Sequence, residues 1–158
     1  MIRVLCVGRV REEHFSRALA EYEKRLSRYA QLEIIEAAEE KAPENLSAAQ
    51  RDQVKRLESA RLTDKLREGE LAVTLAPEGT QLSSEELAGK LAGWQNAGKS
   101  RIAFLIGGSL GLSDEALARA DFRLSFSKMT FPHQLFRVML LEQLYRAYKI
   151  IGNEPYHK

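Results

Sequence analysis

Hydrophobic and polar positions along the chain follow two alternating patterns, and together they predict strands separated by helices. Short apolar runs typical of strands lie at residues 2–7, 32–36, 71–75, 102–106 and 122–126. Strands that alternate with helices in this way imply an α/β layered fold with a mostly parallel sheet. The run 102–106 is the most apolar, so we expect it in the middle of the sheet with both faces covered.

The segments between these runs carry helical signals. An amphipathic helix is expected within residues 11–29, because four apolar residues recur there at spacings of four, three and four. They are Phe15, Leu19, Tyr22 and Leu26. Capping-box spacings, a serine followed three residues later by Gln or Glu, predict the starts of two more helices. They are Ser47 with Gln50, whose helix should run to about Arg67, and Ser83 with Glu86.

Two further helices are expected in the C-terminal part. Ser113 can cap a short helix that ends near Ala120, and a final helix should run from about Pro132 to Ile151. The final helix leaves little of its circumference polar, so more than one side of it must be covered. A second subunit in a two-fold dimer is one natural cover. A central core helix in a monomer is the alternative.

Composition limits the kind of protein. The chain has 158 residues, of which 44% are hydrophobic, enough for one sizeable core and short for two, so a single domain over residues 1–158 is expected. No apolar run reaches the roughly 18–20 residues that span a bilayer, and the N-terminus lacks the apolar region of a signal peptide. We therefore expect a soluble, cytoplasmic protein with no membrane partner.

The lone cysteine and the histidines do not suggest a metal site. Cys6 cannot form an internal disulfide, and in its apolar run it is expected to be a small buried hydrophobe. The three histidines show no ligand spacing with Cys6, so no structural metal is expected. For His133, beside Pro132 at a helix start, a capping or packing role is favoured over catalysis.

Charge is unevenly distributed along the chain, although the net charge is only +2. Residues 1–30 hold seven basic and four acidic side chains, and residues 119–158 hold seven basic and three acidic side chains. The middle of the chain, residues 31–118, holds ten basic and fifteen acidic side chains. If the two basic ends meet in space, they can form a face that binds the phosphates of a nucleic acid. A solvated surface of mixed charge is the alternative.

A ligand site is expected beyond the carboxyl ends of the strands, as is usual in parallel α/β sheets. Three segments reach that edge: Leu75 with the turn 76–79, the glycine-rich segment 107–112, and residues 125–131. Glycines at 107, 108 and 111 would permit left-handed backbone and close approach of a ligand. A tight strand-to-helix turn without a ligand remains the alternative, because the spacing matches neither GxGxxG nor a P-loop.

The chain contains two extended motifs, Ile106-Gly107-Gly108-Ser109-Leu110-Gly111-Leu112 and Leu124-Ser125-Phe126-Ser127-Lys128-Met129-Thr130-Phe131-Pro132-His133-Gln134. They resemble the cofactor-binding half of the SPOUT-class methyltransferases that modify a pseudouridine in the bacterial large ribosomal subunit. Arg137-Val138, residues 142–147 and the tail Pro155-Tyr156-His157 match as well. With Val7-Gly8 and residues 21–25 and 41–45, the similarity covers essentially the whole chain.

The resemblance implies a SPOUT fold: a Rossmann-like sheet with a deep trefoil knot in its C-terminal part, and a homodimer that completes the active site. It implies S-adenosylmethionine as the methyl donor, bound largely through backbone groups, and no metal. The positions that correspond to donor contacts are Leu75, Gly108, Leu124, Ser125, Phe126, Ser127, Lys128 and Met129. On this basis Gly108→Val is expected to abolish donor binding by filling the ligand's space.

The implied reaction is methylation of N3 of a pseudouridine in large-subunit ribosomal RNA, with the assembled ribosome as the expected partner. The resemblance places Arg146, Tyr156 and His157 near the base, with Glu142 orienting Arg146. Tyr156 could stack on the base, His157 could accept its proton, and Arg146 could hold a phosphate or the deprotonated imide. An ordinary i,i+4 ion pair and an inert tail are the alternatives at these positions. For the function of the whole chain there are two alternatives. One is a SPOUT-like enzyme acting on another RNA, such as transfer RNA, and the other is a non-catalytic ribosome-binding or assembly protein.

Overall fold

A computed structural model describes residues 1–156. Five parallel strands form one sheet in the order β2-β1-β4-β3-β5. The strands are β1 (Ile2–Val7), β2 (Leu32–Ala37), β3 (Leu71–Gln81), β4 (Ile102–Ile106) and β5 (Phe122–Ser125). The helices are α1 (Glu13–Leu26), α2 (Ala48–Thr63), α3 (Ser84–Asn96), α4 (Asp114–Ala118) and α5 (His133–Ile151).

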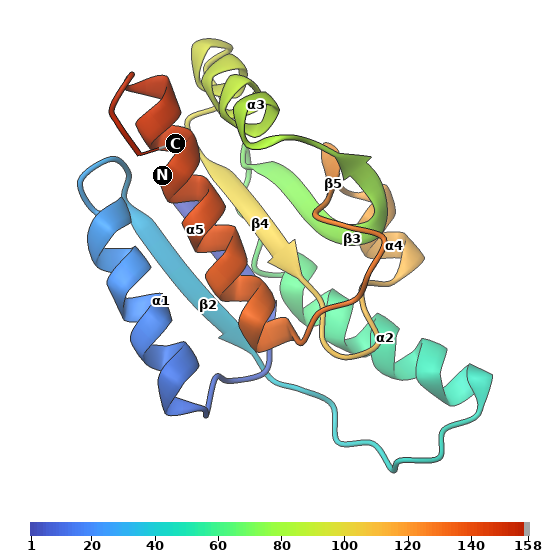
Figure 1. The fold of residues 1–158 in the computed structure, drawn as a ribbon. Coiled ribbons are helices and arrows are strands. Elements are labelled where there is room, and N and C mark those ends of the chain that lie inside the picture. Colours follow the sequence, from blue (N-terminus) through green and yellow to red (C-terminus); the bar gives the residue numbers. More distant parts are fainter. Residues whose placement is uncertain (157–158) are drawn as a thin grey trace.

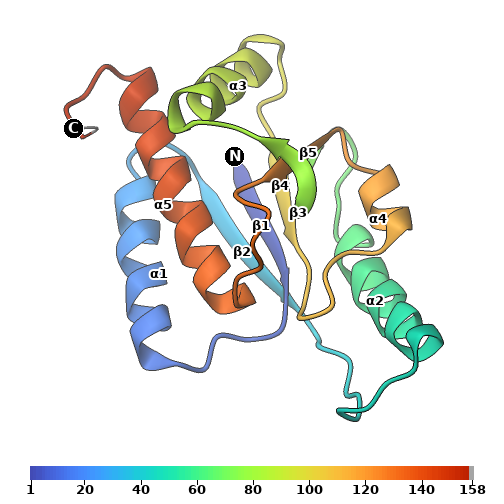
Figure 2. The same ribbon diagram turned by 45° about the vertical axis from the view of Figure 1, so that its right-hand side comes forward.

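The apolar run 102–106 is the central strand, as predicted. β4 pairs with β1 and β3, and all five of its residues are buried. Side chains alternate between the two faces of a strand, so Phe104 lies in the core beneath α1, α3 and α5, whereas Leu105 faces α2 and α4. The sheet is therefore covered on both sides (Figures 1 and 2).

The predicted helix starts are confirmed. Ser47 and Ser83 both form complete capping boxes, and the Ser113 hydroxyl accepts the N–H of Ala116 at 3.3 Å. In α1 the apolar face packs against the sheet through Leu19 and Leu26, which are buried. α5 lies between α1 and α3 over the centre of the sheet, so the first and last helices are neighbours (Figure 1). The two basic ends of the chain therefore do meet in space.

Several element ends differ from the predictions. α2 ends at Thr63 rather than near Arg67, and β5 ends at Ser125. The largest difference is in β3, which continues to Gln81 instead of ending in a turn after Leu75.

The continuation of β3 is possible because β5 supplies new partners after a break. The register of the β3–β5 pairing shifts between Leu75 and Thr80, and the two strands pass very close to each other at Gly79. A Cβ atom at Gly79 would lie 2.7 Å from the backbone carbon of Leu124, so only glycine fits. Pro77 and Gly79 thus belong to an interrupted strand, not to a strand-to-helix turn.

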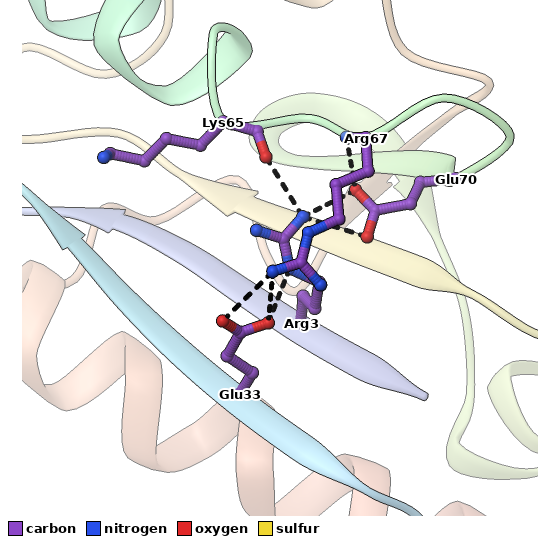
Figure 3. A network of polar contacts seen from close by, with 5 residues as sticks. All are labelled: Arg3, Glu33, Lys65, Arg67 and Glu70. Carbon is purple, nitrogen blue, oxygen red and sulfur yellow. Dashed lines mark hydrogen bonds and ion pairs between the residues drawn. The ribbon is translucent and has the colours of Figure 1, made fainter.

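The amino end of the sheet is closed by a buried ionic network (Figure 3). Arg3, which is 2% exposed, donates from Nε to Glu33 at 2.9 Å and from Nη1 to Glu70 at 2.7 Å. The same Nη1 donates to the Lys65 carbonyl oxygen at 3.0 Å, and Glu70 also accepts the Arg67 N–H at 2.8 Å. The network joins β1, β2 and the segment between α2 and β3.

Candidate functional site

A cavity of about 330 Å³ opens at the carboxyl end of β4 and beside the interrupted part of β3, in the region where a ligand site was predicted. Among its lining residues are five of the predicted donor contacts, contributed by the middle of β3, the turn after β4 and the segment after β5. They are Leu75, Gly108, Phe126, Ser127 and Met129. Met129 is 73% exposed, so part of an apolar wall faces solvent.

The other three predicted contacts do not line this cavity. Leu124 and Ser125 are buried in β5, and Lys128 is not among the lining residues. The Ser125 hydroxyl has one proton, which it shares between the carbonyl oxygens of Pro77 and Ser127, both at 3.0 Å. Ser125 therefore holds the chain after β5 against the interrupted part of β3 and fixes the shape of the cavity wall.

The glycine turn after β4 depends on glycine for two different reasons. Gly111 has φ of 83°, so the expected left-handed backbone is confirmed there and is wrong for Gly107 and Gly108. Gly107 instead allows close packing, because a Cβ atom would lie 2.5 Å from the backbone carbon of Gly111. Within the turn, the Gly111 N–H donates to the Gly108 carbonyl oxygen at 3.0 Å.

Gly108 contributes its backbone to the cavity, but a side chain there would point elsewhere. A Cβ atom would lie 2.6 Å from Oε2 of Glu58 and 3.2 Å from Cγ1 of Val7, toward α2 and β1. The expectation that Gly108→Val blocks the ligand's space is therefore wrong, because the new side chain would collide with Glu58. Glu58 is 3% exposed and accepts the Glu40 N–H at 2.9 Å, and burial raises the pKa of its carboxyl.

The start of α5 forms another wall of the cavity. Phe136 packs against Phe126 and Phe131, with ring centroids 4.9 and 6.0 Å away. His133 lies beside them and is half-buried, and burial followed by the positive charge of Arg137 lowers the pKa of its imidazole. No side chain caps α5, whose N-cap residue is Pro132, so packing is the role that His133 has in this structure.

Arg137 ties this end of α5 to the sheet. It is 1% exposed, and its Nη2 donates to the carbonyl oxygens of Val7 at 2.6 Å and Gly8 at 2.8 Å. Nη1 donates to Glu36 at 3.0 Å, while Nε is buried with no hydrogen-bond partner among residues 1–156. Cys6, one residue before these carbonyl groups, is buried as predicted, and desolvation raises the pKa of its thiol to about 11.

Three of the four predicted catalytic residues lie together near the other end of α5. Arg146 donates from Nε to Glu142 at 3.0 Å, and its guanidinium carbon lies 4.8 Å from the centroid of the Tyr156 ring. The Tyr156 hydroxyl donates to Glu142 at 3.3 Å. Burial, followed by the charge of Glu142, raises the pKa of the Tyr156 phenol, which is therefore protonated at neutral pH. The fourth residue, His157, lies outside the described residues.

The chain just before Tyr156 is held in place by Glu154. Glu154 accepts a hydrogen bond from the Tyr29 hydroxyl at 2.9 Å and pairs with Lys149. Tyr29 also stacks on Tyr148 of α5, with ring centroids 5.9 Å apart. The segment that follows α5 is thus attached both to α5 and to the loop between α1 and β2.

Within one chain, the Arg146 cluster and the cavity are separate. Phe136, which lines the cavity, precedes Arg146 by ten residues, or about 15 Å along a helix. Glu142 lines a different hollow of about 490 Å³, between α1, α3 and α5, together with Leu124 and Phe126. The structure therefore brings Arg146, Glu142 and Tyr156 to one another, and it brings Glu142 near the predicted donor contacts Leu124 and Phe126. None of the three lines the cavity beside the glycine turn.

Two features common to other protein classes are absent from residues 1–156. They contain no group of three or more His, Cys, Asp or Glu side chains that could hold a metal ion. Within the same range, none of the helices combines the length and apolar character required of a membrane span.

Comparison with known proteins decides the family. A family model described as "Predicted SPOUT methyltransferase" matches residues 1–157. The chain belongs to the SPOUT methyltransferase family. Two relatives called "Ribosomal RNA large subunit methyltransferase H", from Acetivibrio thermocellus and Bifidobacterium animalis subsp. lactis, are 53% and 54% identical to it. Each match covers 99% of both chains. The family membership that the motifs indicated is thus confirmed.

Solved structures support the fold of this SPOUT chain at much lower identity. A probable methylase family protein from Haemophilus influenzae Rd KW20 superposes with a TM-score of 0.56 at 15% identity, over 99% of this chain and 70% of that one. A putative methylase family protein from Neisseria gonorrhoeae gives a TM-score of 0.54 at 15% identity, over 99% and 85% of the two chains. These similarities concern the fold alone.

The sequence did not reveal the roles of several residues that shape the site. Lys55 of α2 lines the cavity, Phe136 forms part of its aromatic wall, and Glu58 and Arg137 lie behind it. Phe131, which also lines the cavity, belongs to the segment 125–131 that was expected at this edge of the sheet. The mostly apolar composition of the last helix could have pointed to Phe136. No comparable signal marks Lys55 or Glu58. Charged residues of α2 occur on all sides of the helix, so its buried face cannot be recognised from the spacing of apolar residues.

Proposed function

We propose that this protein transfers a methyl group from S-adenosylmethionine to N3 of a pseudouridine in large-subunit ribosomal RNA. The observation that carries the proposal is about 50% identity over full length to proteins named ribosomal RNA large subunit methyltransferase H. The cavity, which is lined by five of the eight predicted donor positions, also supports it. The N3 position and the assembled ribosome as substrate come from the family resemblance of the motifs.

The residues of the cavity fit S-adenosylmethionine. Its volume of about 330 Å³ falls within the roughly 300–1,000 Å³ typical of small-molecule sites. Leu75, Phe126 and Met129 offer apolar cover for the faces of an adenine, and the glycine turn exposes backbone donors and acceptors for its edge. The bound donor would supply a methyl group on a positively charged sulfur, so the protein's task is alignment and removal of the imide proton.

The Arg146 cluster would serve the RNA. Arg146, oriented by Glu142, would hold a phosphate or the deprotonated imide, and Tyr156 would stack on the target base. A phenol with a raised pKa is a poor proton acceptor near neutral pH, so we assign proton transfer to His157.

A homodimer would bring the two halves of the site together. Arg146 and Tyr156 do not line the cavity of their own chain, which supports the proposal that the cluster of one subunit faces the cavity of its partner. We also propose that the C-terminal part is knotted, as the family resemblance implies. The path from β5 at the edge of the sheet back to α5 over its centre is compatible with a knot (Figure 2). Sedimentation at micromolar concentration tests the dimer, and a single monomeric species would contradict it.

A methylation assay tests the reaction and its substrate. The purified protein and labelled S-adenosylmethionine would be incubated with assembled ribosomes, isolated large subunits, free ribosomal RNA or transfer RNA. We expect N3-methylpseudouridine, identified by mass spectrometry of nucleosides, in large-subunit RNA only. Methylation of transfer RNA alone would favour the other-RNA alternative. Calorimetry that detects no binding of S-adenosylmethionine would favour a non-catalytic ribosome-binding protein.

Removal of residues 156–158 tests the role of the tail. Because these residues would act on the RNA, donor affinity should be nearly unchanged while methylation falls at least about a hundredfold, the contribution of a positioned acid-base group. A truncated protein that methylates ribosomes at the full rate would exclude the tail from catalysis.

A further inference from the structure

Lys55 is a positively charged side chain in the wall of the glycine-turn cavity. The cavity is lined on one side by α2, through Lys55, and on another by residues 107–112. Four residues after Lys55, the Ser59 hydroxyl accepts the Ser113 N–H at 2.8 Å and fixes α2 to the chain that follows the turn. Residues four apart share one helix face, so Lys55 lies one turn from this attachment, beside the glycine turn.

The ammonium group of Lys55 is not fixed by a hydrogen bond, although its charge, after a backbone hydrogen bond and Arg56, contributes to lowering the pKa of the Glu115 carboxyl. The side chain is half-buried and forms no hydrogen bond or ion pair with any residue between 1 and 156. The neighbouring Arg56, in contrast, pairs with Asp52 at 2.9 Å and with Glu115 at 3.4 Å. A lysine placed in this way can pack its apolar stem against the wall and direct its charge into the cavity.

The other titratable groups around the cavity make Lys55 its positive end. Burial and the charge of Arg137 lower the pKa of His133, so this imidazole is neutral at neutral pH. Glu78, from the interrupted part of β3, is exposed and carries a negative charge. The lining therefore presents an ammonium group on α2 and a carboxylate on β3, besides its apolar and backbone surfaces.

We propose that Lys55 binds the carboxylate of the amino-acid end of the methyl donor. The inference rests on the proposed function, since it takes S-adenosylmethionine as the occupant of the cavity. The apolar residues and glycine backbone suit the adenosine part of that molecule but offer no charge for its carboxylate. Lys55 supplies one, with three N–H donors on a flexible stem.

The experiment compares two ligands that share the adenosine part. S-Adenosylhomocysteine keeps the carboxylate and ammonium groups, whereas 5′-methylthioadenosine lacks the amino-acid end. Their dissociation constants would be measured by calorimetry for the full-length protein and for Lys55→Met, Lys55→Arg and Lys99→Met. Lys99 is an exposed lysine between α3 and β4, so Lys99→Met is a matched control for the loss of one positive charge.

Lys55→Met should weaken S-adenosylhomocysteine binding about tenfold and change methylthioadenosine binding less than about twofold, since one charge-assisted hydrogen bond is lost. Lys55→Arg, which keeps the charge, should recover most of the affinity, and Lys99→Met should match the parent protein. Equal weakening of both ligands, or unchanged binding of both, would overturn the assignment. Unchanged donor binding with a raised KM for ribosomes would overturn it in favour of an RNA phosphate. If neither ligand binds the parent protein, the proposed function itself fails.

Discussion

The two ends of the sheet each contain a buried arginine, but the two are bound very differently. At the amino end, Arg3 contacts two carboxylates and a carbonyl group, and the Glu70 side chain is completely buried with it (Figure 3). At the carboxyl end, Arg137 has one carboxylate, from Glu36, which is 36% exposed, and the carbonyl groups of β1. Its buried Nε has no hydrogen-bond partner among residues 1–156.

This difference separates an end that stabilises the fold from an end that shapes a site. The Arg3 network closes its end of the sheet with nearly every polar group satisfied. Arg137 keeps an unsatisfied donor while it holds the start of α5, whose Phe136 and His133 form the cavity wall. Polar groups left unsatisfied in a native structure are often found where function limits packing.

The largest effect on stability is expected from Arg3→Met. Removal of the guanidinium leaves the buried Glu70 carboxylate without its ion pair, which costs about 3–5 kcal/mol of unfolding free energy. The affinity for the methyl donor should not change, because the Arg3 network lies at the opposite end of the sheet from the cavity. Urea unfolding and calorimetry check the two parts, with the exposed Arg17→Met as the control. A weakened donor affinity in the folded Arg3→Met protein would contradict the separation of the two ends.

Arg137→Met should have a smaller effect on stability and a larger one on the site. Two carbonyl groups of β1 and its following loop lose their donor, which costs about 1–3 kcal/mol. Because the start of α5 is then released from the sheet, binding of S-adenosylhomocysteine should weaken at least about tenfold, or by about 1.4 kcal/mol. The same urea and calorimetry measurements apply. Parent-like affinity in a folded variant would show that the anchor is not needed for the cavity wall.

The pKa of His133 offers the smallest and most local comparison. In the parent protein it should lie below 6.5, and Arg137→Met should raise it because the neighbouring positive charge is removed. Arg3→Met should leave it unchanged. The C–H proton signals of the imidazole ring, followed by NMR during a pH titration, report these values directly.

The lowered pKa of His133 also makes stability depend on pH. The unfolded chain takes up this proton near pH 6.5, before the folded protein does, so the folded state loses stability as the pH falls from 6.5 toward the lower folded pKa. His133→Gln should remove this part of the loss. Identical pH dependence of unfolding in the two proteins would contradict the burial of His133.

Local patterns predicted the elements of this fold well, and long-range contacts account for the errors. The apolar run 102–106 and the caps at Ser47 and Ser83 depend on neighbouring residues, and the structure confirms them. The predicted end of β3 was wrong because a Pro-Glu-Gly sequence is typical of a turn. Whether it stays in a strand depends on pairing of Thr80 with Leu124, which lies far along the chain.

The site was only partly predictable for the same reason. The motifs located Leu75, Gly108 and the segment after β5, and five of those positions line the cavity. Arg137 binds carbonyl groups about 130 residues earlier in the chain, and a backbone carbonyl leaves no mark in a sequence. The roles of Arg146, Tyr156 and His157, the dimer and the knot remain predictions.

The attachment of Glu154 to Tyr29 and Lys149 bears on the entropy cost of the proposed stacking of Tyr156 on a base. A free chain end would sample many conformations, and ordering it around a base would cost free energy at the moment of binding. Here Glu154 fixes the backbone two residues before Tyr156, and Glu142 fixes the Tyr156 hydroxyl. The Tyr156 ring is therefore preorganised by folding. A base that stacks on it would need to order the Tyr156 side chain and its backbone very little, so the loss of conformational entropy on binding would be small.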